Sequence, residues 1–331
     1  MATLFKQQAD LKQTGSHSYT ASHHGDWAMG PTIFGGCIVG VIHLAASTHF
    51  RTTLQKYDQP DVLTLHLEFL RYSTLESFDI TVTDLKKGGV HCTIQLQLTQ
   101  GGQLKAIALA TSINFDKPVG PTVVTDWALE PPPPTPAPNF AKVLANESDE
   151  NWIPGSVNGE VAPLTRHILA LNARGGFQVA GIADAWNCFT AEPMDATCIA
   201  LMCDMIPSMS DTLLHNGGLY DAHKNFATME EWAEKNPGQV CPLTNTLAEA
   251  AGAEVFNNTV SLDVEFKKKI PEEGIKWTFT RAATKQLKGG RMDLDLTICD
   301  EQMELVCLGR QVILCLDARK RFKGKKKASN L

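Results

Sequence analysis

The chain alternates apolar and polar side chains through the stretch Val62-Leu63-Thr64-Leu65-His66-Leu67-Glu68-Phe69-Leu70. A period of two is typical of a half-buried β-strand, because successive side chains point to opposite faces of a sheet. Further alternating runs follow at residues 78–83, 90–98 and 104–113, with Gly-Gly pairs at 88–89 and 101–102 between them. Glycine pairs favour tight hairpin turns, so the pattern predicts an antiparallel meander.

The same pattern returns in the second half of the chain. Strands are predicted at residues 259–267, 275–283, 292–298 and 303–316, with turns at residues 289–290 and 300–301. Lys87-Gly88-Gly89 and Lys288-Gly289-Gly290 lie 201 residues apart, and Glu68-Phe69 precedes Glu265-Phe266 by 197. This self-similarity indicates one structural unit encoded twice.

A segment of small and apolar residues precedes each predicted meander. Residues 34–46 read FGGCIVGVIHLAA, and residues 196–206 read ATCIALMCDMI. Both are apolar nearly all round, which predicts helices that are buried on every side. The predicted fold class is therefore α+β, a tandem (double) hotdog in which each antiparallel sheet wraps around a central helix.

The repeat and the composition divide the chain into units. Prolines 131–134, 136 and 138 predict an extended, surface-running connector between the halves. Residues 215–254 depart from regular structure and are interpreted as an insertion that covers one face of the second unit. The predicted units are an N-terminal hotdog (1–117), a Pro-rich connector (118–159), a C-terminal hotdog (160–318) and a basic tail (319–331).

The composition excludes several classes of function. Of the 331 residues 43% are hydrophobic and 20% charged, and the net charge of −6 gives no reason to expect a nucleic-acid partner. No apolar run reaches the roughly 18 residues of a membrane helix, and residues 1–15 lack the apolar core of a secretory signal. The nine cysteines are odd in number and lie mostly in apolar runs, which favours reduced thiols over a disulfide framework.

Three polar residues of the second half match apolar or small residues in the first. Asp204 aligns with Cys37, Thr259 with Val62, and Gln311 with Ala110. A carboxylate on an apolar helix costs several kcal/mol in desolvation unless partners satisfy it. Thr and Gln offer a hydroxyl and an amide, which could hold a water for the carboxylate to deprotonate. The alternative is a structural Asp that caps nearby backbone.

The other candidate residues lie in the first half. The pair Gly35-Gly36 begins the first predicted helix, where backbone N–H groups could stabilise the oxygen of a bound thioester, although close helix–sheet packing also explains the glycines. Cys37 follows them and is a further candidate substrate contact. A nucleophilic role at the helix N-terminus has no assignable His or carboxylate partner, so a small packing residue is the alternative. His66 sits mid-strand and is a second candidate contact, with a surface or interface role as the alternative. No His, Cys and Asp combine at ligand spacing, so neither a metal nor a cofactor is predicted.

Several of these segments resemble the type II acyl-CoA thioesterases and the related thioesterase-like proteins. The resemblance rests on Ile33-Phe34-Gly35-Gly36, on Leu65-His66-Leu67-Glu68-Phe69, and on the surroundings of Asp204, Thr259 and Gln311. It covers residues 25–116 and 160–318. In that family an Asp, a Thr and a Gln position the water that hydrolyses the thioester, without metal or redox cofactor. Family members usually carry Gln after the two glycines, where this chain has Cys37.

The resemblance implies a thioester hydrolase acting on an acyl-CoA or a carrier-bound acyl group. The alternative is a non-hydrolytic hotdog protein that binds, isomerises or dehydrates a pathway-specific acyl or polyketide intermediate, in lipid or secondary metabolism. No nucleic-acid or membrane partner is expected, and a homo-oligomer is favoured because hotdog sheets commonly pack side by side. The cytosol is the default location. The final Ser329-Asn330-Leu331 resembles a peroxisomal signal, which makes the peroxisome the alternative.

Overall fold

The computed structural model describes residues 3–145, 147, 149–218 and 221–318. Its main sheet has 15 strands, and β1 and β2 lie at one end and β12 at the other. The strands follow the spatial order β1 (Lys12–Gly15), β2 (Ser18–Ala21), β6 (Phe78–Lys86), β7 (Thr93–Gln100), β8 (Gln103–Ile113), β5 (Asp61–Phe69), β13 (Val255–Phe266), β17 (Leu305–Asp317), β16 (Arg291–Cys299), β14 (Thr278–Ala283), β11 (Ile182–Phe189), β10 (Ile168–Ala173), β9 (Trp152–Val157) and β12 (Cys241–Leu243). β15 (Leu287–Lys288) pairs with β16, and β3 (Ala28–Met29) and β4 (Thr32–Ile33) form a small separate sheet.

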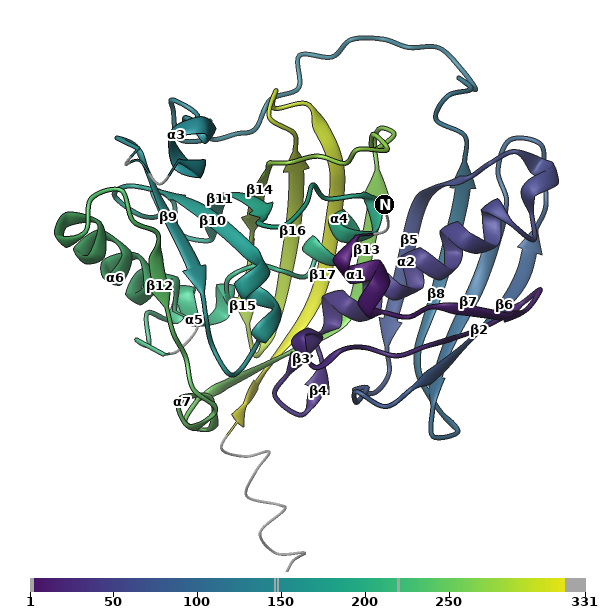
Figure 1. Ribbon diagram of the computed structural model, residues 1–331, viewed down its shortest axis with the longest axis horizontal. Coiled ribbons are helices and arrows are strands. Elements are labelled where there is room, and N and C mark those ends of the chain that lie inside the picture. The colour runs from purple at the N-terminus through teal and green to yellow at the C-terminus, as the bar shows by residue number, and fades with distance from the viewer. Residues whose placement is uncertain (1–2, 146, 148, 219–220, 319–331) are drawn as a thin grey trace, which may run out of the picture.

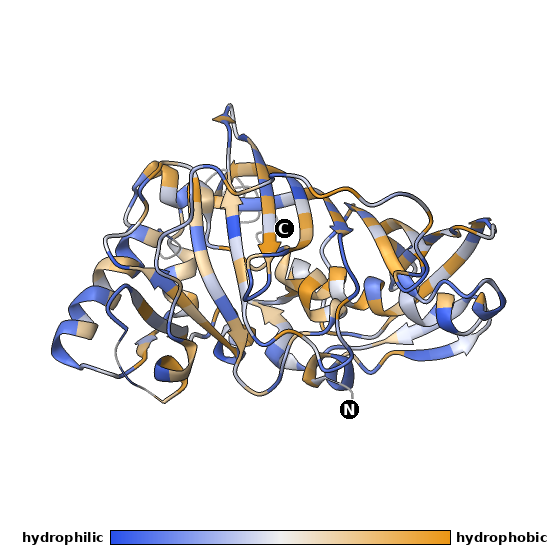
Figure 2. Ribbon diagram, turned by 90° about the horizontal axis from the view of Figure 1, so that it is seen from above, coloured by the Kyte–Doolittle hydropathy of each residue, from blue (hydrophilic) through white to orange (hydrophobic). Residues whose placement is uncertain are grey.

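This order confirms the tandem hotdog. Outward from the middle, β5-β8-β7-β6-β2-β1 in the first half corresponds to β13-β17-β16-β14-β11-β10 in the second. β9 and β12 extend the second half beyond the repeat. Figure 1 shows the two halves side by side, with the first in purple to blue and the second in teal to yellow. Along the strands, hydrophilic and hydrophobic bands alternate as the period of two predicts (Figure 2).

The two halves join through the antiparallel pair β5–β13. His66 lies opposite Asp263, Glu68 opposite Ser261, and Thr64 opposite Glu265. Asp263 follows His66 by 197 residues, which is the spacing of the repeat in these strands, so the two residues are counterparts and pair with each other. Two residues further along each strand, Glu68 pairs with Ser261 and Thr64 pairs with Glu265, so the pairing is symmetric about His66 and Asp263. A local two-fold axis therefore passes through the His66–Asp263 pair and relates the two hotdogs.

The central helices pack against each other inside this arrangement. α2 (Gly35–Arg51) lies against the sheet of the first half and contacts α4 (Ala196–Met202) of the second. Glycines permit the close approach, since a Cβ added at Gly36 would lie 2.6 Å from the carbonyl oxygen of Leu201, and one at Gly40 3.5 Å from its Cβ. The other helices are α1 (Leu4–Gln8), α3 (Phe140–Leu144), α5 (Met209–Leu214), α6 (Ala222–Lys235) and α7 (Leu247–Ala251).

The second central helix is shorter than predicted, because it ends at Met202 rather than at residue 206. Pro207 supplies the reason. A proline has no N–H to donate to the carbonyl four residues earlier, and its ring clashes with that carbonyl. The helical path is interrupted after Cys203 and resumes as α5 at Met209.

The predicted segments between the repeats also contain regular structure. The stretch predicted as connector holds α3 and, at its end, strand β9 of the main sheet. The predicted insertion 215–254 holds α6, β12 and α7. The strands β1, β2, β10 and β11 were not predicted.

All nine cysteines lie among the described residues and are free thiols, eight of them buried. Within the described part of the chain, no helix is both long and apolar enough to cross a membrane. The predicted basic tail, including Ser329-Asn330-Leu331, lies outside the described residues.

Candidate active site

The carboxylate of Asp204 stands at the turn that follows α4. The turn exists because Pro207 interrupts the helix, and the same interruption leaves the carbonyl of Cys203 without its helical donor. The side-chain amide of Gln311 donates to that carbonyl at 2.7 Å. Gln311 is 1% exposed and comes from the middle of β17, so a buried amide anchors the turn beneath Asp204.

Thr259 reaches the same place through a β-bulge. Leu262 and Val264 of β13 point into the core, and strict alternation would turn Thr259 outward. The register shifts by one residue between Thr259 and Ser261, which reverses the alternation and directs Thr259 inward. Its hydroxyl lies 3.4 Å from Oε1 of Gln311. Strand β13 begins at Val255, four residues before the predicted start, and the bulge was not predicted.

The first half contributes the N-terminus of α2. A Cβ added at Gly35 would lie 2.6 Å from Oδ2 of Asp204, so only glycine leaves room for the carboxylate there. The backbone N–H of Gly36 interacts with the same carboxylate. The positive end of a helix dipole favours an anion at this position. The candidate site is thus shared between both hotdogs.

Burial raises the pKa of Asp204 from 3.8 to about 7, although hydrogen bonding from Gln311, from the Gly36 N–H and from Thr259 lowers it in part. The residue as a whole keeps intermediate exposure on its turn. A carboxyl group with this pKa can exchange a proton near neutral pH, as a general base requires.

Two of the residues predicted as substrate contacts, Cys37 and His66, are not placed to contact a substrate at this site. Cys37 is fully buried, and burial together with the nearby charge of Asp204 raises the pKa of its thiol well above the ordinary value. It is therefore a protonated packing residue. His66 lies on the face of the sheet opposite the central helices, where its ring contacts Asp263 at 2.6 Å and Glu68 at 3.5 Å. Its strand alternation, with Leu65 and Leu67 inward, accounts for the outward direction.

The helix pair also corrects the match between the repeats. His43 of α2 contacts the hydroxyl of Thr197 in α4 at 3.1 Å. This contact corresponds to that of Asp204 with Gly36, because Asp204 follows His43 by 161 residues and Thr197 follows Gly36 by the same number. The contacts therefore make His43, not Cys37, the counterpart of Asp204. The strands of the two halves could be aligned on their Gly-Gly turns, but the two central helices offer no such shared feature, so the sequence did not show which helix residues correspond.

A cleft of about 610 Å³ lies at the counterpart position. His43, Thr197 and Val62 line it, and Val62 is the counterpart of Thr259 at a matching bulge in β5. Burial lowers the pKa of His43 to about 4, so the ring is neutral at physiological pH. His43, Val62 and Ala110 thus stand where the second half has Asp204, Thr259 and Gln311, although Asp61, Glu192 and Asp195 also line the cleft.

Comparison with known proteins agrees with this architecture. Residues 131–315 match the acyl-CoA thioesterase C-terminal domain, and residues 23–113 match the acyl-CoA thioesterase N-terminal domain. The chain belongs to the acyl-CoA thioesterase family. As a family member, it is a thioesterase-like hydrolase whose substrate is an acyl thioester.

Individual relatives of this thioesterase are distant. The thioesterase-like protein TwmA from Talaromyces wortmannii is 25% identical over 99% of this chain and 96% of its own length. The solved acyl-CoA thioesterase II TesB2 from Mycobacterium marinum has a TM-score of 0.63 at 17% identity, covering 95% of this chain and 98% of that one. A hotdog protein from Alicyclobacillus acidocaldarius has a TM-score of 0.67 at 15% identity, covering 96% and 99%. At these identities the solved structures show the fold alone.

The sequence analysis missed two residues that shape the candidate site. Cys203 takes part through its carbonyl, which no side-chain pattern reveals. Pro207 acts by breaking the helix, and its position inside an apolar run, four residues after Cys203, was the available signal.

Proposed function

We propose that this thioesterase hydrolyses its acyl thioester by direct attack of a water held by Asp204, Thr259 and Gln311. The observation that carries the proposal is the placement of the Asp204 carboxylate between the N-terminus of α2 and the Thr259–Gln311 pair, with a pKa near 7. The half with Asp204 keeps three polar groups that its duplicate replaces, which supports a chemical role for them beyond packing.

Asp204 accepts a proton from the water as the water oxygen bonds to the thioester carbon, and the carbonyl oxygen becomes an oxyanion. The tetrahedral intermediate collapses, the C–S bond breaks, and Asp204 returns the proton to the leaving sulfur. The products are a free acid and a thiol. The N-terminus of α2 stabilises negative charge in both states, on Asp204 before attack and on the oxyanion afterwards.

Thr259 and Gln311 have distinct parts in this proposal. The amide of Gln311 has two hydrogens, and one is used by the carbonyl of Cys203. The second is directed toward Asp204, and Oε1 lies 3.4 Å from the hydroxyl oxygen of Thr259. Gln311 therefore fixes the orientation of both neighbours, while Thr259 offers its oxygen to the water.

The test measures free-thiol release over a panel of acyl-CoAs from short to long and aromatic. The wild type is compared with Asp204→Asn, which keeps the size of the side chain and removes the base. We expect kcat/KM to fall by about 10²- to 10⁴-fold. Asp263→Asn is the matched control, because Asp263 lies on the same strand as Thr259 but on the outer face. An unchanged rate in Asp204→Asn, with a substrate that the wild type turns over, would refute the proposal.

A second candidate function is supported by the cleft around His43. It has the size of a small-molecule site and contains a buried, neutral histidine next to the Thr197 hydroxyl, where the second half has Asp204. Such a cleft suits non-hydrolytic binding of an acyl ligand. Retention of an acyl ligand without thiol release by the wild type, and loss of that retention in a cleft-filling Val62→Phe variant, would favour this function. Loss of retention in Asp204→Asn but not in Val62→Phe would argue against it.

A further inference from the structure

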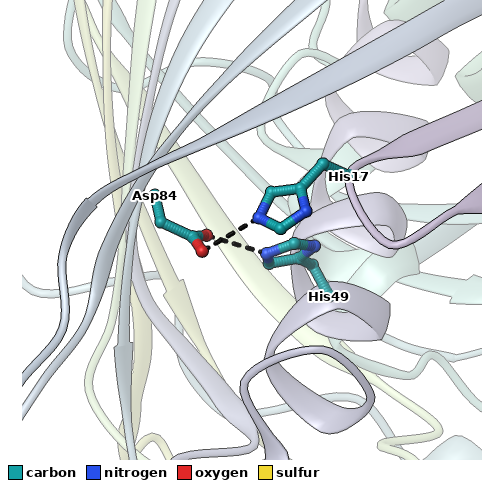
Figure 3. Close-up of side chains that lie close together, drawn as sticks. All are labelled: His17, His49 and Asp84. Carbon is teal, nitrogen blue, oxygen red and sulfur yellow. Dashed lines mark hydrogen bonds and ion pairs between the residues drawn. The ribbon is translucent and has the colours of Figure 1, made fainter.

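A second polar cluster lies in the first hotdog, near the C-terminal end of α2. It unites His17 from the β1–β2 turn, His49 from α2 and Asp84 from β6 (Figure 3). The three residues are far apart in sequence, which is why no ligand spacing predicted a metal there. The site of Asp204 lies at the other end of α2, so the thioesterase reaction does not use this cluster.

The geometry brings three ligand atoms to one point. Nε2 of His17 lies 2.9 Å from Oδ2 of Asp84, and Nε2 of His49 lies 2.9 Å from Oδ1. One ligand atom from each residue lies within 4.8 Å of the others. In a tetrahedral zinc site with bonds of about 2.0 Å, neighbouring ligand atoms are separated by about 3.3 Å. Small rotations of two rings and one carboxylate therefore suffice.

The cluster is built into the protein rather than placed on its surface. The side chain of His49 is 0% exposed and that of Asp84 is 6% exposed, whereas that of His17 is 42% exposed. Two ligands are thus fixed by packing, and the third leaves the site open to solvent. This combination provides both a pre-formed site and an entry path.

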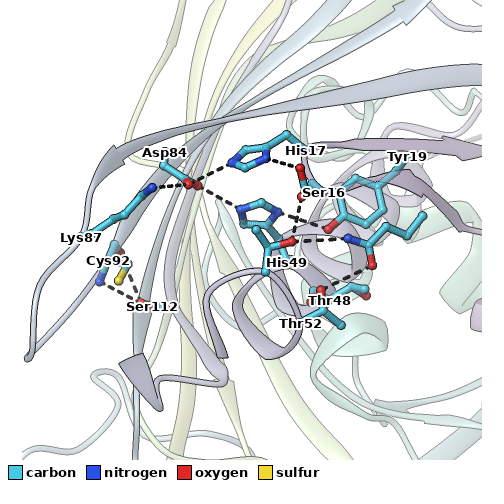
Figure 4. Close-up of polar contacts among 12 residues, drawn as sticks. Ser16, His17, Tyr19, Thr48, His49, Thr52, Asp84, Lys87, Cys92 and Ser112 are labelled. Atoms are coloured by element: carbon cyan, nitrogen blue, oxygen red, sulfur yellow. Dashed lines mark hydrogen bonds and ion pairs between the residues drawn. The ribbon is translucent and has the colours of Figure 1, made fainter. Parts of the chain in front are cut away.

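Both histidines have their second ring nitrogen held by a hydroxyl. Nδ1 of His49 lies 3.2 Å from the hydroxyl of Tyr19, and Nδ1 of His17 lies 2.9 Å from that of Ser16 (Figure 4). Metal-binding histidines commonly donate this N–H to a neighbouring group, which orients the ring and keeps the other nitrogen free for the metal. The two rings thus present Nε2 to a common point.

One charged group competes for this point. The ammonium of Lys87 lies 2.9 Å from Oδ2 of Asp84. The lysine side chain is 46% exposed, so it can turn into solvent when a doubly charged ion takes its place. The competition provides a direct test, because removal of this ammonium should strengthen metal binding while leaving all three ligands in place.

We propose that His17, His49 and Asp84 form a binding site for one divalent transition-metal ion of the zinc type. Two imidazole nitrogens and one carboxylate oxygen are the ligands that zinc prefers, and a water would complete a tetrahedron. The ion links the β1–β2 hairpin, α2 and β6, so its binding stabilises the first hotdog. The site is separate from the hydrolysis described above.

The experiment titrates Zn²⁺ into full-length, chelator-treated protein by calorimetry, and follows thermal unfolding with and without Zn²⁺. We expect one ion per chain and a rise in Tm. Cobalt(II) in place of zinc should give a tetrahedral d–d spectrum without thiolate-to-metal charge transfer, which excludes the nine cysteines as ligands. His17→Gln should weaken binding at least tenfold, Asp84→Asn should abolish it, and Lys87→Gln should tighten it.

The chain contains a matched control in a second His–Asp–His group. His24 and His167 lie 3.3 Å and 3.4 Å from Asp26, which is also paired with Arg166. His24→Gln should leave zinc binding unchanged. Because the side chain of His17 is partly exposed, His17→Gln is expected to fold, and circular dichroism of this variant checks that it does. The proposal is overturned if the wild type binds no zinc, or if binding persists undiminished in folded His17→Gln and Asp84→Asn.

Discussion

The Asp204 carboxylate ionises near neutral pH, and this makes the proposed reaction dependent on pH. The base must be unprotonated, and burial raises its pKa to about 7. We predict that kcat/KM rises about tenfold per pH unit below pH 7 and levels off above it. A pH–rate profile between pH 5 and 9 with a non-ionisable acyl substrate measures this. A flat profile across that range would contradict the role of Asp204 as base.

The same raised pKa predicts an effect on stability. The folded state holds the Asp204 proton more tightly than the unfolded state, so ionisation reduces the free energy of unfolding as the pH rises from about 4 to 7. Asp204→Asn removes this penalty. Allowing for partial solvent screening, we expect the variant to be more stable than wild type by about 2–4 kcal/mol at pH 8, and equally stable near pH 4. Urea unfolding at both pH values checks the sign.

At the scale of elements, the N-terminus of α2 meets two different neighbours through adjacent glycines. A methyl group at Gly35 would meet the side-chain carboxylate of Asp204, and one at Gly36 the backbone carbonyl of Leu201 in α4. Gly35→Ala should therefore displace the carboxylate and lower kcat/KM about 10- to 100-fold with little change in stability. Gly36→Ala should destabilise the fold by about 1–3 kcal/mol, because backbone cannot move aside.

Paired kinetics and urea unfolding of these two variants separate the effects. Gly89→Ala is the control, since an added Cβ there meets no atom within 4 Å. Equal losses of activity and stability in Gly35→Ala and Gly36→Ala would show that the helix terminus acts only through packing.

The halves of the molecule depend on each other, since the candidate site takes α2 from one and Asp204, Thr259 and Gln311 from the other. The β5–β13 pair and the α2–α4 contact hold them together without the connector. We predict that cleavage at a protease site inserted between Val123 and Val124, which are 80% and 92% exposed, leaves the halves associated and active. Size-exclusion chromatography and thiol release test this. Separation of the halves in native buffer would contradict it.

The sequence by itself determined the repeated unit. Alternation through Val62–Leu70 and its counterpart, together with the glycine turns, predicted the strands of both meanders, because period and turn chemistry are local properties. Gly101 and Gly102 do adopt positive φ, as do Gly289 and Gly290. The asymmetry of the repeat also singled out Thr259 against Val62 and Gln311 against Ala110, and the structure brings both side chains to Asp204. Asp204 was singled out through a match with Cys37, whereas its counterpart in the structure is the polar His43.

The tertiary structure alone decided how these residues meet. Thr259 turns inward through a bulge, Asp204 stands on a turn made by Pro207, and Gly35 arrives from the other half. His17, His49 and Asp84 likewise converge from three separate elements. Such juxtapositions depend on long-range packing between strands and helices, which leaves no periodic signal in the chain. Local patterns specify the elements, and only their packing specifies which side chains share a site.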